Sequence, residues 1–329
     1  MQRFALLGAG FIGSVHAANL ATHPKVEFAS VFDFSSERAE EIAARYGARI
    51  ATSVQDALTG VDAVFIASST DTHAANLRAA VDAGVAALCE KPIDLDLGRA
   101  RDVVGYAEAA HATVMVNFNR RFDPDHAELK RVVDAGGIGE VELVQMTCRG
   151  PVVPPLEYVK VSGGQMRDQT VHFFDLARWI AGADPVEVFA AGSALAEPRL
   201  ADYDDVDTSV CVLKLLNGAL VQIDNNRRTG YGYDERIEVL GSVGLVESAR
   251  HRVRQVTQYL PGQVIASRLP DGWFERMRPT YFQALDHFVR ALESGAEVRP
   301  NLRDGLKAQA IAEAATRSLH TGASERITY

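Results

Sequence analysis

Three glycines near the start of the chain constrain its fold more than any other feature. Gly8, Gly10 and Gly13 form a G-x-G-x-x-G pattern, which follows an apolar strand expected over Phe4–Gly8 and opens a helical stretch. In this context the first glycine permits a tight turn, the second lets the backbone approach a pyrophosphate, and the third allows close packing of helix on strand. We therefore predict that the N-terminus of this helix binds a dinucleotide.

An acidic residue at the end of the second expected strand refines this prediction. Asp33 closes the strand expected over Val26–Asp33, where a carboxylate accepts hydrogen bonds from ribose hydroxyls and repels a 2′-phosphate. It favours NAD over NADP, although Arg38 nearby can pair with a phosphate and soften that preference. The alternative, a glycine turn in a nucleotide-free α/β domain, does not account for the agreement of strand, motif, helix and acidic residue.

The rhythm of apolar segments predicts two domains. Further strands are expected over 61–68, 85–89 and 113–118, alternating with helical stretches, so residues 1–119 are predicted to form a Rossmann domain with a doubly wound parallel sheet. Alternating segments over 140–147, 209–215 and 219–224 predict that residues 120–329 form an α+β domain with an open, largely antiparallel sheet. Helices are expected over 281–294 and 302–320.

Composition narrows the compartment and the partners. The net charge is −9 and no dense run of lysine and arginine occurs, so nucleic acid is not expected as a partner. No apolar run reaches the roughly 20 residues of a membrane-spanning helix, and the start does not resemble a signal peptide. Only Cys89, Cys148 and Cys211 occur, which predicts neither a disulfide framework nor a cysteine-rich zinc site. We expect a cytoplasmic protein without a metal.

Lys91 follows an apolar strand, in the sequence Glu90-Lys91-Pro92. Ligands of open α/β sheets gather at the carboxyl ends of strands, and a proline there fixes the direction of the turn. Lys91 is therefore a candidate to face the nicotinamide, while a merely solvated lysine at a strand end remains the alternative. We also expect Ser68, Thr70, His73 and Glu90 to bind the cofactor, together with Phe11 and Ile12 of the glycine turn.

Three titratable residues share one face of a helix expected before Gly182. Asp168, His172 and Asp175 stand at i, i+4 and i+7, and a carboxylate one turn from an imidazole can orient it. His172 is thus a candidate general base. A solvated acidic face with a stray histidine is the alternative that these residues alone leave open.

Gly8 to Gly13, Glu90-Lys91-Pro92 and Asp168-x-x-x-His172 together resemble the glucose–fructose oxidoreductase and inositol dehydrogenase family. Segments 119–123 and 230–234 are most similar to bacterial inositol 2-dehydrogenases. The resemblance implies catalytic Lys91, Asp168 and His172, and an NAD-dependent oxidation of a ring hydroxyl of a cyclic polyol, myo-inositol to 2-keto-inositol. It also implies a homo-oligomer, a dimer or a homotetramer, formed through the second sheet. By the same resemblance, the residues expected to face substrate are Lys91, Arg120, Cys148, Asp168, His172, Asp175, Tyr233, Trp273 and Tyr281.

One departure from the family pattern leaves the substrate open. Around Arg149 the chain carries Cys148 and Gly150, where inositol dehydrogenases often place a histidine and an asparagine. Dehydrogenation of another inositol, an aldose or an anhydrosugar, with NAD or NADP, is therefore a second possibility. A non-catalytic dinucleotide sensor is a third, since a fold does not dictate an activity, and a zinc-dependent dehydrogenase is a fourth.

Overall fold

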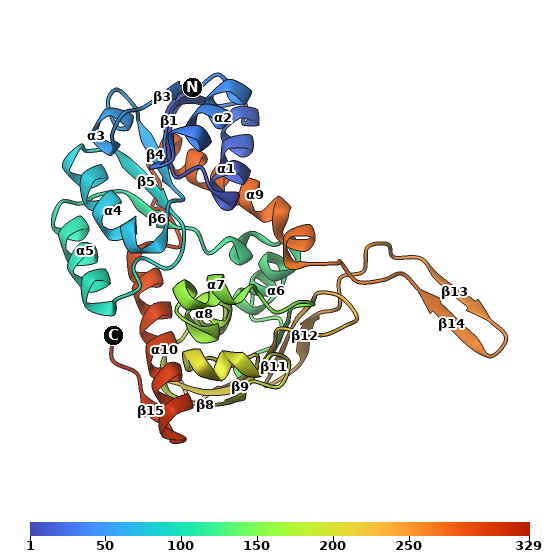
Figure 1. The fold of residues 1–329 in the computed structure, drawn as a ribbon. Helices are drawn as coiled ribbons and strands as arrows, with labels where there is room; N and C mark the ends of the chain where they lie inside the picture. Colours follow the sequence, from blue (N-terminus) through green and yellow to red (C-terminus); the bar gives the residue numbers. More distant parts are fainter. The chain divides into compact units, whose positions relative to one another are not determined.

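The computed structural model describes residues 1–329, which divide into two compact units (Figure 1). The first unit comprises Met1–Phe122 and Pro279–Gln309, and the second comprises Asp123–Arg278 and Ala310–Tyr329. The expected division into 1–119 and 120–329 differs from these units, because residues 279–309 return to the first one. Their apolar side chains complete its core.

The first unit contains a six-stranded sheet with the order β3-β2-β1-β4-β5-β6, in which all pairs are parallel. The strands are β1 Gln2–Leu7, β2 Val26–Phe32, β3 Arg49–Ile50, β4 Ala63–Ile66, β5 Ala86–Cys89 and β6 Val114–Val116. The helices are α1 Phe11–Thr22, α2 Ser36–Tyr46, α3 Val54–Ala57, η1 Thr70–Thr72, α4 His73–Asp82, α5 Leu97–Ala109 and η2 Asn119–Phe122. This confirms the predicted Rossmann sheet, and β3 is an addition to it.

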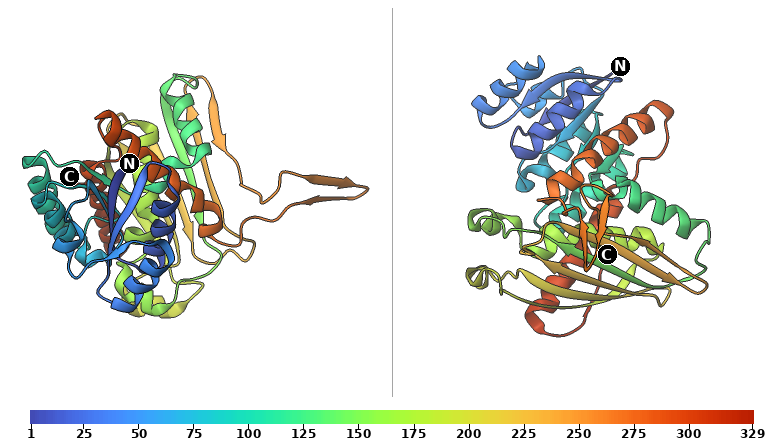
Figure 2. Two further views of the ribbon diagram at one scale, coloured as in Figure 1. Left: turned by 90° about the horizontal axis from the view of Figure 1, so that it is seen from above. Right: turned by 90° about the vertical axis from the view of Figure 1, so that its right-hand side faces the viewer.

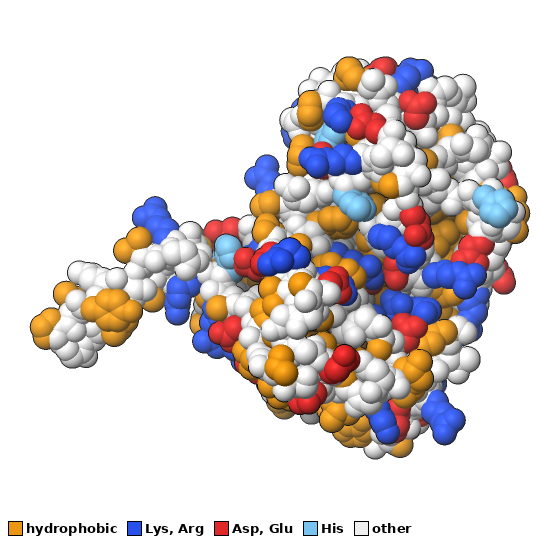
Figure 3. Space-filling model, turned by 180° about the vertical axis from the view of Figure 1, so that it is seen from behind, with side chains coloured by type: hydrophobic (Ala, Val, Ile, Leu, Met, Phe, Trp, Pro, Cys, Tyr) orange, Lys and Arg blue, Asp and Glu red, His pale blue; other side chains and the backbone are white.

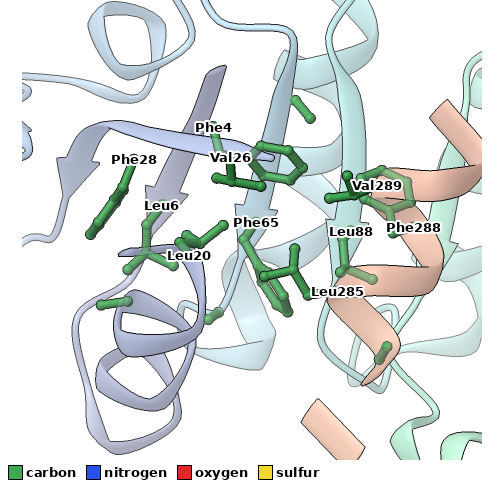
Figure 4. Packing of buried hydrophobic residues seen from close by; sticks show 14 of the residues in the cluster. Phe4, Leu6, Leu20, Val26, Phe28, Phe65, Leu88, Leu285, Phe288 and Val289 are labelled. Atoms are coloured by element: carbon green, nitrogen blue, oxygen red, sulfur yellow. The ribbon is translucent and has the colours of Figure 1, made fainter. Parts of the chain in front are cut away.

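Helices cover both faces of this sheet, which explains why its strands are almost uniformly apolar. The α1 and α2 helices lie on one face and α4 and α5 on the other (Figure 1). The part of α9 (Trp273–Ser294) that belongs to the first unit contacts α1 and the residue after it, through the ring pairs His16–Tyr281 and His23–Phe282. In Figure 4, Leu285, Phe288 and Val289 of α9 lie beside Leu88 and Phe65 of the central strands, and all five are fully buried.

The second unit is built on a seven-stranded sheet with the order β12-β11-β7-β10-β9-β8-β15. Only β7 and β10 pair in parallel, so the prediction of a largely antiparallel sheet is confirmed. Its strands are β7 Val141–Arg149, β8 Pro185–Ser193, β9 Thr208–Leu215, β10 Leu220–Asn226, β11 Asp234–Gly241, β12 Leu245–Ser248 and β15 Glu325–Arg326. The helices are α6 Pro124–Asp134, α7 Leu156–Ser162, η3 Met166–Thr170, α8 Val171–Ala181, η4 Pro198–Tyr203 and α10 Leu302–Thr321, which begins in the first unit.

The strand β9 shows how this sheet is covered. From Ser209 onward its residues alternate between buried and exposed. One face of the sheet is covered by helices, with α6 against β12 and α8 against β7, and the other face is exposed. The α8 helix ends at Gly182, which adopts φ 65° and donates its amide to the carbonyl of Arg178, as the sequence predicted. None of the helices in the chain combines the length and the apolar character that crossing a membrane requires.

A separate two-stranded hairpin extends from the second unit. It consists of β13 Thr257–Leu260 and β14 Gln263–Ala266, which form a sheet of their own. The left-hand view of Figure 2 shows the hairpin standing away from the seven-stranded sheet, as does Figure 1. After it, the chain enters α9 and passes into the first unit at Pro279, a residue without a backbone N–H donor inside the helix.

Candidate functional site

The glycine turn between β1 and α1 has different spatial demands at each of its three positions. Gly8 adopts φ +98°, and a Cβ there would lie 2.5 Å from the backbone of Ser68. A Cβ at Gly13 would lie 2.1 Å from the carbonyl oxygen of Gly8. At Gly10, in contrast, a Cβ would meet nothing within 4 Å. The outer glycines are thus required for packing, whereas the middle one faces open space.

The N-terminus of α1 is suited to an anion. Gly10 is the N-cap and provides no side-chain hydrogen bond, and the first turn contains no acidic residue. The first amide groups of the helix therefore retain their donor capacity and the positive end of the helix dipole is not neutralised. Of the neighbours predicted to bind cofactor, Phe11 is 63% exposed and Ile12 packs partly against the hydrophobic core.

The carboxylate of Asp33 is hydrogen-bonded to the glycine turn and to the start of the segment after β2. One carboxylate oxygen accepts a hydrogen bond from the amide of Ala9 at 2.6 Å, and the other accepts one from the amide of Ser35 at 2.8 Å. The side chain of Ser35 in turn caps α2 by accepting from the amide of Arg38. The position of the carboxylate after β2 is therefore fixed from both sides. Ribose binding by Asp33 stays a prediction.

His73 links the loops that follow β4 and β5. Its Nδ1 lies 2.8 Å from the carbonyl oxygen of Pro92, and its Nε2 lies 3.0 Å from that of Ser68. The hydroxyl of Ser68 lies 2.7 Å from that of Thr72, while Thr70 begins the short helix η1. The imidazole is buried. It thereby holds together two segments at the carboxyl ends of neighbouring parallel strands.

A buried polar cluster lies directly before Lys91. The Oε1 atom of Glu90 accepts hydrogen bonds from Nε2 of His16 and from Nδ2 of Asn117, both at 2.7 Å. Burial by itself raises the pKa of Glu90, but these two donors and the charges of His16 and Lys91 outweigh it, so the pKa lies below its usual range. Glu90 therefore carries a buried negative charge. Lys91 itself is half-buried, and its peptide bond to Pro92 is cis.

The three titratable residues Asp168, His172 and Asp175 lie where α8 begins. The expected single regular helix through Asp168, His172 and Asp175 is wrong in detail, because residues Met166–Thr170 form a π-helical turn before the α-helix Val171–Ala181. Such turns contain one extra residue and change the angular spacing of side chains. Asp168 is partly exposed, whereas the other two residues are buried.

Asp168 has two partners that the sequence did not suggest. The hydroxyl of Tyr158 donates to its Oδ1 at 2.8 Å, and the guanidinium of Arg227 lies 3.9 Å from its Oδ2. Arg227 is itself buried and pairs with Oδ2 of Asp205 at 2.7 Å. A hydroxyl donor and a cation thus stabilise the negative charge of Asp168.

The other residues expected to face substrate differ in accessibility. Cys148 is fully buried, and Nε2 of Gln169 lies 3.2 Å from its sulfur. The hydroxyl of buried Tyr233 donates to Glu235. Buried Tyr281 meets the ring of His16 edge-on at 5.4 Å. The remaining three are Arg120, which is 7% exposed, Asp175, which is fully buried, and Trp273, which is 40% exposed.

The predicted residues therefore fall into two groups. The glycine turn, Asp33, His73, Glu90 and Lys91 belong to the first unit, together with Arg120 and Tyr281. Cys148, Asp168, His172, Asp175, Tyr233 and Trp273 belong to the second unit. Sequence reasoning missed His16, Asn117, Tyr158 and Arg227. The signal available for His16 was a lone imidazole on the helix after the glycine motif, but its partners are distant in sequence.

The cysteines and possible metal ligands add one observation each. All three cysteines are free thiols with buried side chains, and burial raises the pKa of Cys211 to about 12. Desolvation, followed by the charge of Glu90, raises the pKa of Cys89 well above its usual range. The structure contains no group of three histidine, cysteine, aspartate or glutamate side chains placed to hold a metal ion.

The first unit fits a dinucleotide. A pyrophosphate and a ribose need open space in front of Gly10, a helix N-terminus without a capping or an acidic side chain, and a fixed carboxylate after the second strand. In such a fit the amides of the glycine turn hold the pyrophosphate and Asp33 holds the adenosine ribose.

Comparison with known proteins agrees with this geometry. Residues 2–118 match the model of an oxidoreductase family with an NAD-binding Rossmann fold, and residues 126–247 match the GFO/IDH/MocA C-terminal domain. Inositol 2-dehydrogenase of Rhizobium meliloti (strain 1021) is 41% identical over 96% of both chains. Myo-inositol 2-dehydrogenase of Thermotoga maritima is 36% identical over 99% of this chain and 98% of that one. The crystal structure of a myo-inositol dehydrogenase from Corynebacterium glutamicum superposes with a TM-score of 0.94 at 34% identity, over 100% of this chain and 99% of that one. The chain belongs to the GFO/IDH/MocA family of oxidoreductases, and its cofactor is NAD.

Proposed function

We propose that the protein oxidises a ring hydroxyl of a cyclic polyol, with myo-inositol as the first substrate to test and 2-keto-inositol as its product. The observation that carries the proposal is the dinucleotide turn, in a chain that is similar over almost its whole length to inositol 2-dehydrogenases. NAD, when bound, supplies the acceptor for the hydride that the ring carbon loses.

His172 and Asp168 are proposed to handle the proton. The imidazole of His172 takes the hydroxyl proton as the C–H bond breaks and the hydride passes to the nicotinamide, so that the C–O single bond becomes the C=O double bond of a ketone. Asp168 acts through His172, orienting the ring and stabilising the imidazolium that forms. The hydroxyl of Tyr158 and the guanidinium of Arg227 support this role, because they keep the carboxylate charged and in place.

Lys91 is proposed to stabilise the oxygen. An ammonium beside the substrate oxygen lowers the energy of the negative charge that develops there as the proton leaves. The neighbours of Lys91 support this role, because Glu90 is buried and fixed by two hydrogen bonds on one side and Pro92, whose ring restricts the backbone, follows on the other.

The direct experiment is a screen for NAD reduction across inositol isomers and common aldoses, followed by absorbance at 340 nm. We expect the highest kcat/KM with an inositol, and activity that survives chelators. Oxidation of aldoses but of no inositol would identify a sugar, and not a cyclic polyol, as the substrate. The departure from the inositol dehydrogenase pattern at Cys148 is the reason to include aldoses. NAD binding with no turnover of any member would support a dinucleotide sensor.

The proposed catalytic roles are tested by Lys91→Ala and His172→Ala. Each is expected to lower kcat by about 100-fold or more while the affinity for NAD changes little, as for groups that act mainly in the transition state. Unchanged turnover on a confirmed substrate would remove that residue from the mechanism.

We also propose that copies of this chain associate, as a dimer or a homotetramer, through the exposed face of the seven-stranded sheet. Neighbouring strands present apolar side chains on this face that are at least a third exposed, and contiguous exposed apolar side chains often mark an interaction surface. These residues are Phe189, Val210, Val212, Leu220, Leu240 and Leu245.

The hairpin β13–β14 is proposed to bind a second copy as well. Tyr259 and Val264 face each other on one side of it, and both are more than 60% exposed. Figure 3 shows apolar side chains at the hairpin and basic ones along it. Between residues 249 and 270 the chain carries four arginines and no acidic residue, against a net charge of −9 overall, so another copy of the chain is an electrostatically favourable partner.

Light scattering of the wild type and of Tyr259→Ser/Val264→Ser tests this arrangement. A smaller particle for the double variant, with unchanged circular dichroism, is expected. A monomeric wild type at micromolar concentration would contradict self-association, and an unchanged oligomer would remove the hairpin from the interface.

A further inference from the structure

The cluster before Lys91 connects three elements of the first unit. His16 lies on α1, three residues after Gly13, while Glu90 follows β5 and Asn117 follows β6. The imidazole and the amide are completely buried, and the carboxylate is 8% exposed. The helix that begins at the dinucleotide turn is thus hydrogen-bonded to the residue next to the proposed catalytic lysine.

This cluster contains buried polar atoms without hydrogen bonds, which lower the stability of the fold. His16 and Asn117 both direct a donor at the same oxygen of Glu90, and their other polar atoms, Nδ1 of His16 and Oδ1 of Asn117, are buried without a hydrogen-bond partner. Buried polar atoms of native proteins are seldom left unpaired, and such exceptions call for an explanation. The ring of His16 is also stacked on Phe65, with 3.7 Å between centroids, which favours the orientation that points Nε2 at Glu90.

We propose that His16 and Asn117 are positioning residues, which hold the carboxylate of Glu90 so that it in turn anchors the ammonium of Lys91. This inference rests on the proposed function, in which Lys91 stabilises the substrate oxygen. It also gives Glu90, which the sequence suggested as a cofactor ligand, a different role: a buried anchor behind the reacting group.

The hydrogen bonds from His16 and Asn117 stabilise the negative charge of Glu90. Burial is the strongest influence on its pKa and raises it, while the bond from His16 is the strongest opposing one. The titratable groups around it are His16 on α1, Cys89 and Lys91 on its own segment, Tyr281 of α9 against His16, and His73 of α4 against the Pro92 carbonyl. Without the His16 donor, the pKa of Glu90 rises and the anchor loses its charge at a higher pH.

Two substitutions of His16 separate the hydrogen bond from the packing. In His16→Gln the amide nitrogen can take the place of Nε2 and donate to Glu90, whereas His16→Leu fills a similar volume without a donor. Both lose the stacked ring. A matched control is His23→Leu, which removes another buried histidine at the end of α1 whose Nε2 lies 3.3 Å from Asp286.

We expect His16→Leu to have a kcat about 10-fold or more below that of His16→Gln at neutral pH, the effect of losing one hydrogen bond to a charged group. The dissociation constant of NAD changes little in both. The acid limb of the pH profile of kcat moves to higher pH in His16→Leu only, and His23→Leu keeps the wild-type profile. Equal kcat and equal profiles for the two His16 variants would overturn the inference.

A second measurement does not depend on turnover. Reductive methylation with ¹³C-formaldehyde labels Lys91, and its resonance is assigned by comparison with Lys91→Arg. In the wild type and in His16→Gln we expect a resonance shifted from those of exposed lysines, and in His16→Leu a resonance among them. An unshifted Lys91 resonance in the wild type would refute the anchor. If no polyol is oxidised, the proposed function fails while this measurement still decides the inference.

Discussion

Gly10→Ala separates cofactor binding from folding more cleanly than any other substitution in the glycine turn. The backbone at Gly10 has φ −71° and ψ −163°, which an alanine adopts without strain, and its Cβ would meet no atom within 4 Å. The unfolding free energy should therefore change by less than about 1 kcal/mol, because two small effects oppose each other. Alanine lowers the entropy of the unfolded chain, which stabilises the fold, but it is a poorer N-cap than glycine, which destabilises it.

Binding of NAD should change much more. The added methyl group enters the open space that a pyrophosphate needs, so the phosphate no longer reaches the amides of the turn. One hydrogen bond to a charged group contributes about 1.5–3 kcal/mol, which corresponds to a roughly 10- to 150-fold increase of the dissociation constant. The kcat at saturating NAD should fall less than the affinity.

Isothermal titration calorimetry with NAD and thermal unfolding without it measure the two effects. Gly105→Ala is the matched control, because this glycine also has nothing within 4 Å but lies within α5. It should raise stability by up to about 1 kcal/mol and leave NAD binding unchanged. Wild-type affinity in Gly10→Ala would refute the assignment of the open space to the pyrophosphate.

Three further predictions follow from single contacts. Gly13→Ala should lower the unfolding free energy by about 1–3 kcal/mol in denaturant titrations, since its Cβ would lie 2.1 Å from the Gly8 carbonyl oxygen. Asp33→Ala should raise the dissociation constant of NAD by about 10-fold and that of NADP by less, because the charge that repels a 2′-phosphate is gone; equal losses in calorimetry would contradict this. Burial raises the pKa of Asp207, but the amides of residues 195–197 and the Thr208 hydroxyl donate to its carboxylate and lower the pKa on balance. The stabilisation of the fold by this carboxylate is therefore complete above the unfolded pKa of about 3.9, and it is lost as the pH falls through the lower folded-state pKa. Asp207→Asn should accordingly lower Tm at pH 7, and the difference from the wild type should shrink below about pH 4.

The sequence was informative about the fold wherever burial controls the pattern. Strands β1, β2, β4, β5 and β6 are apolar because they are covered on both faces, and each lies within its predicted range or overlaps it. The two-residue strand β3, Arg49–Ile50, escaped prediction because it is exposed and shows no apolar run. The π-helical turn before α8 could not be predicted from the sequence, because the four-residue spacing of Asp168 and His172 is compatible with both an α-helix and a π-helical turn.

Local motifs located the candidate residues but not their supports. The glycine turn and Lys91 are marked by short patterns, whereas the bond between His16 and Glu90 joins residues 74 positions apart. Arg227 and Asp168 are likewise brought together only by the pairing of strands in the second unit. No periodicity encodes such contacts, because they depend on topology.

The passage of α9 into the first unit has a consequence for synthesis on the ribosome. When residues 1–122 have emerged, the sheet of the first unit has all its strands, but Leu285, Phe288 and Val289 of its core have not yet been made. The ribosome must first translate the whole segment 123–278. The nucleotide-binding half of the molecule therefore begins first and is completed late, and a nascent chain stalled before α9 leaves the apolar side chains around Phe65 accessible to chaperones.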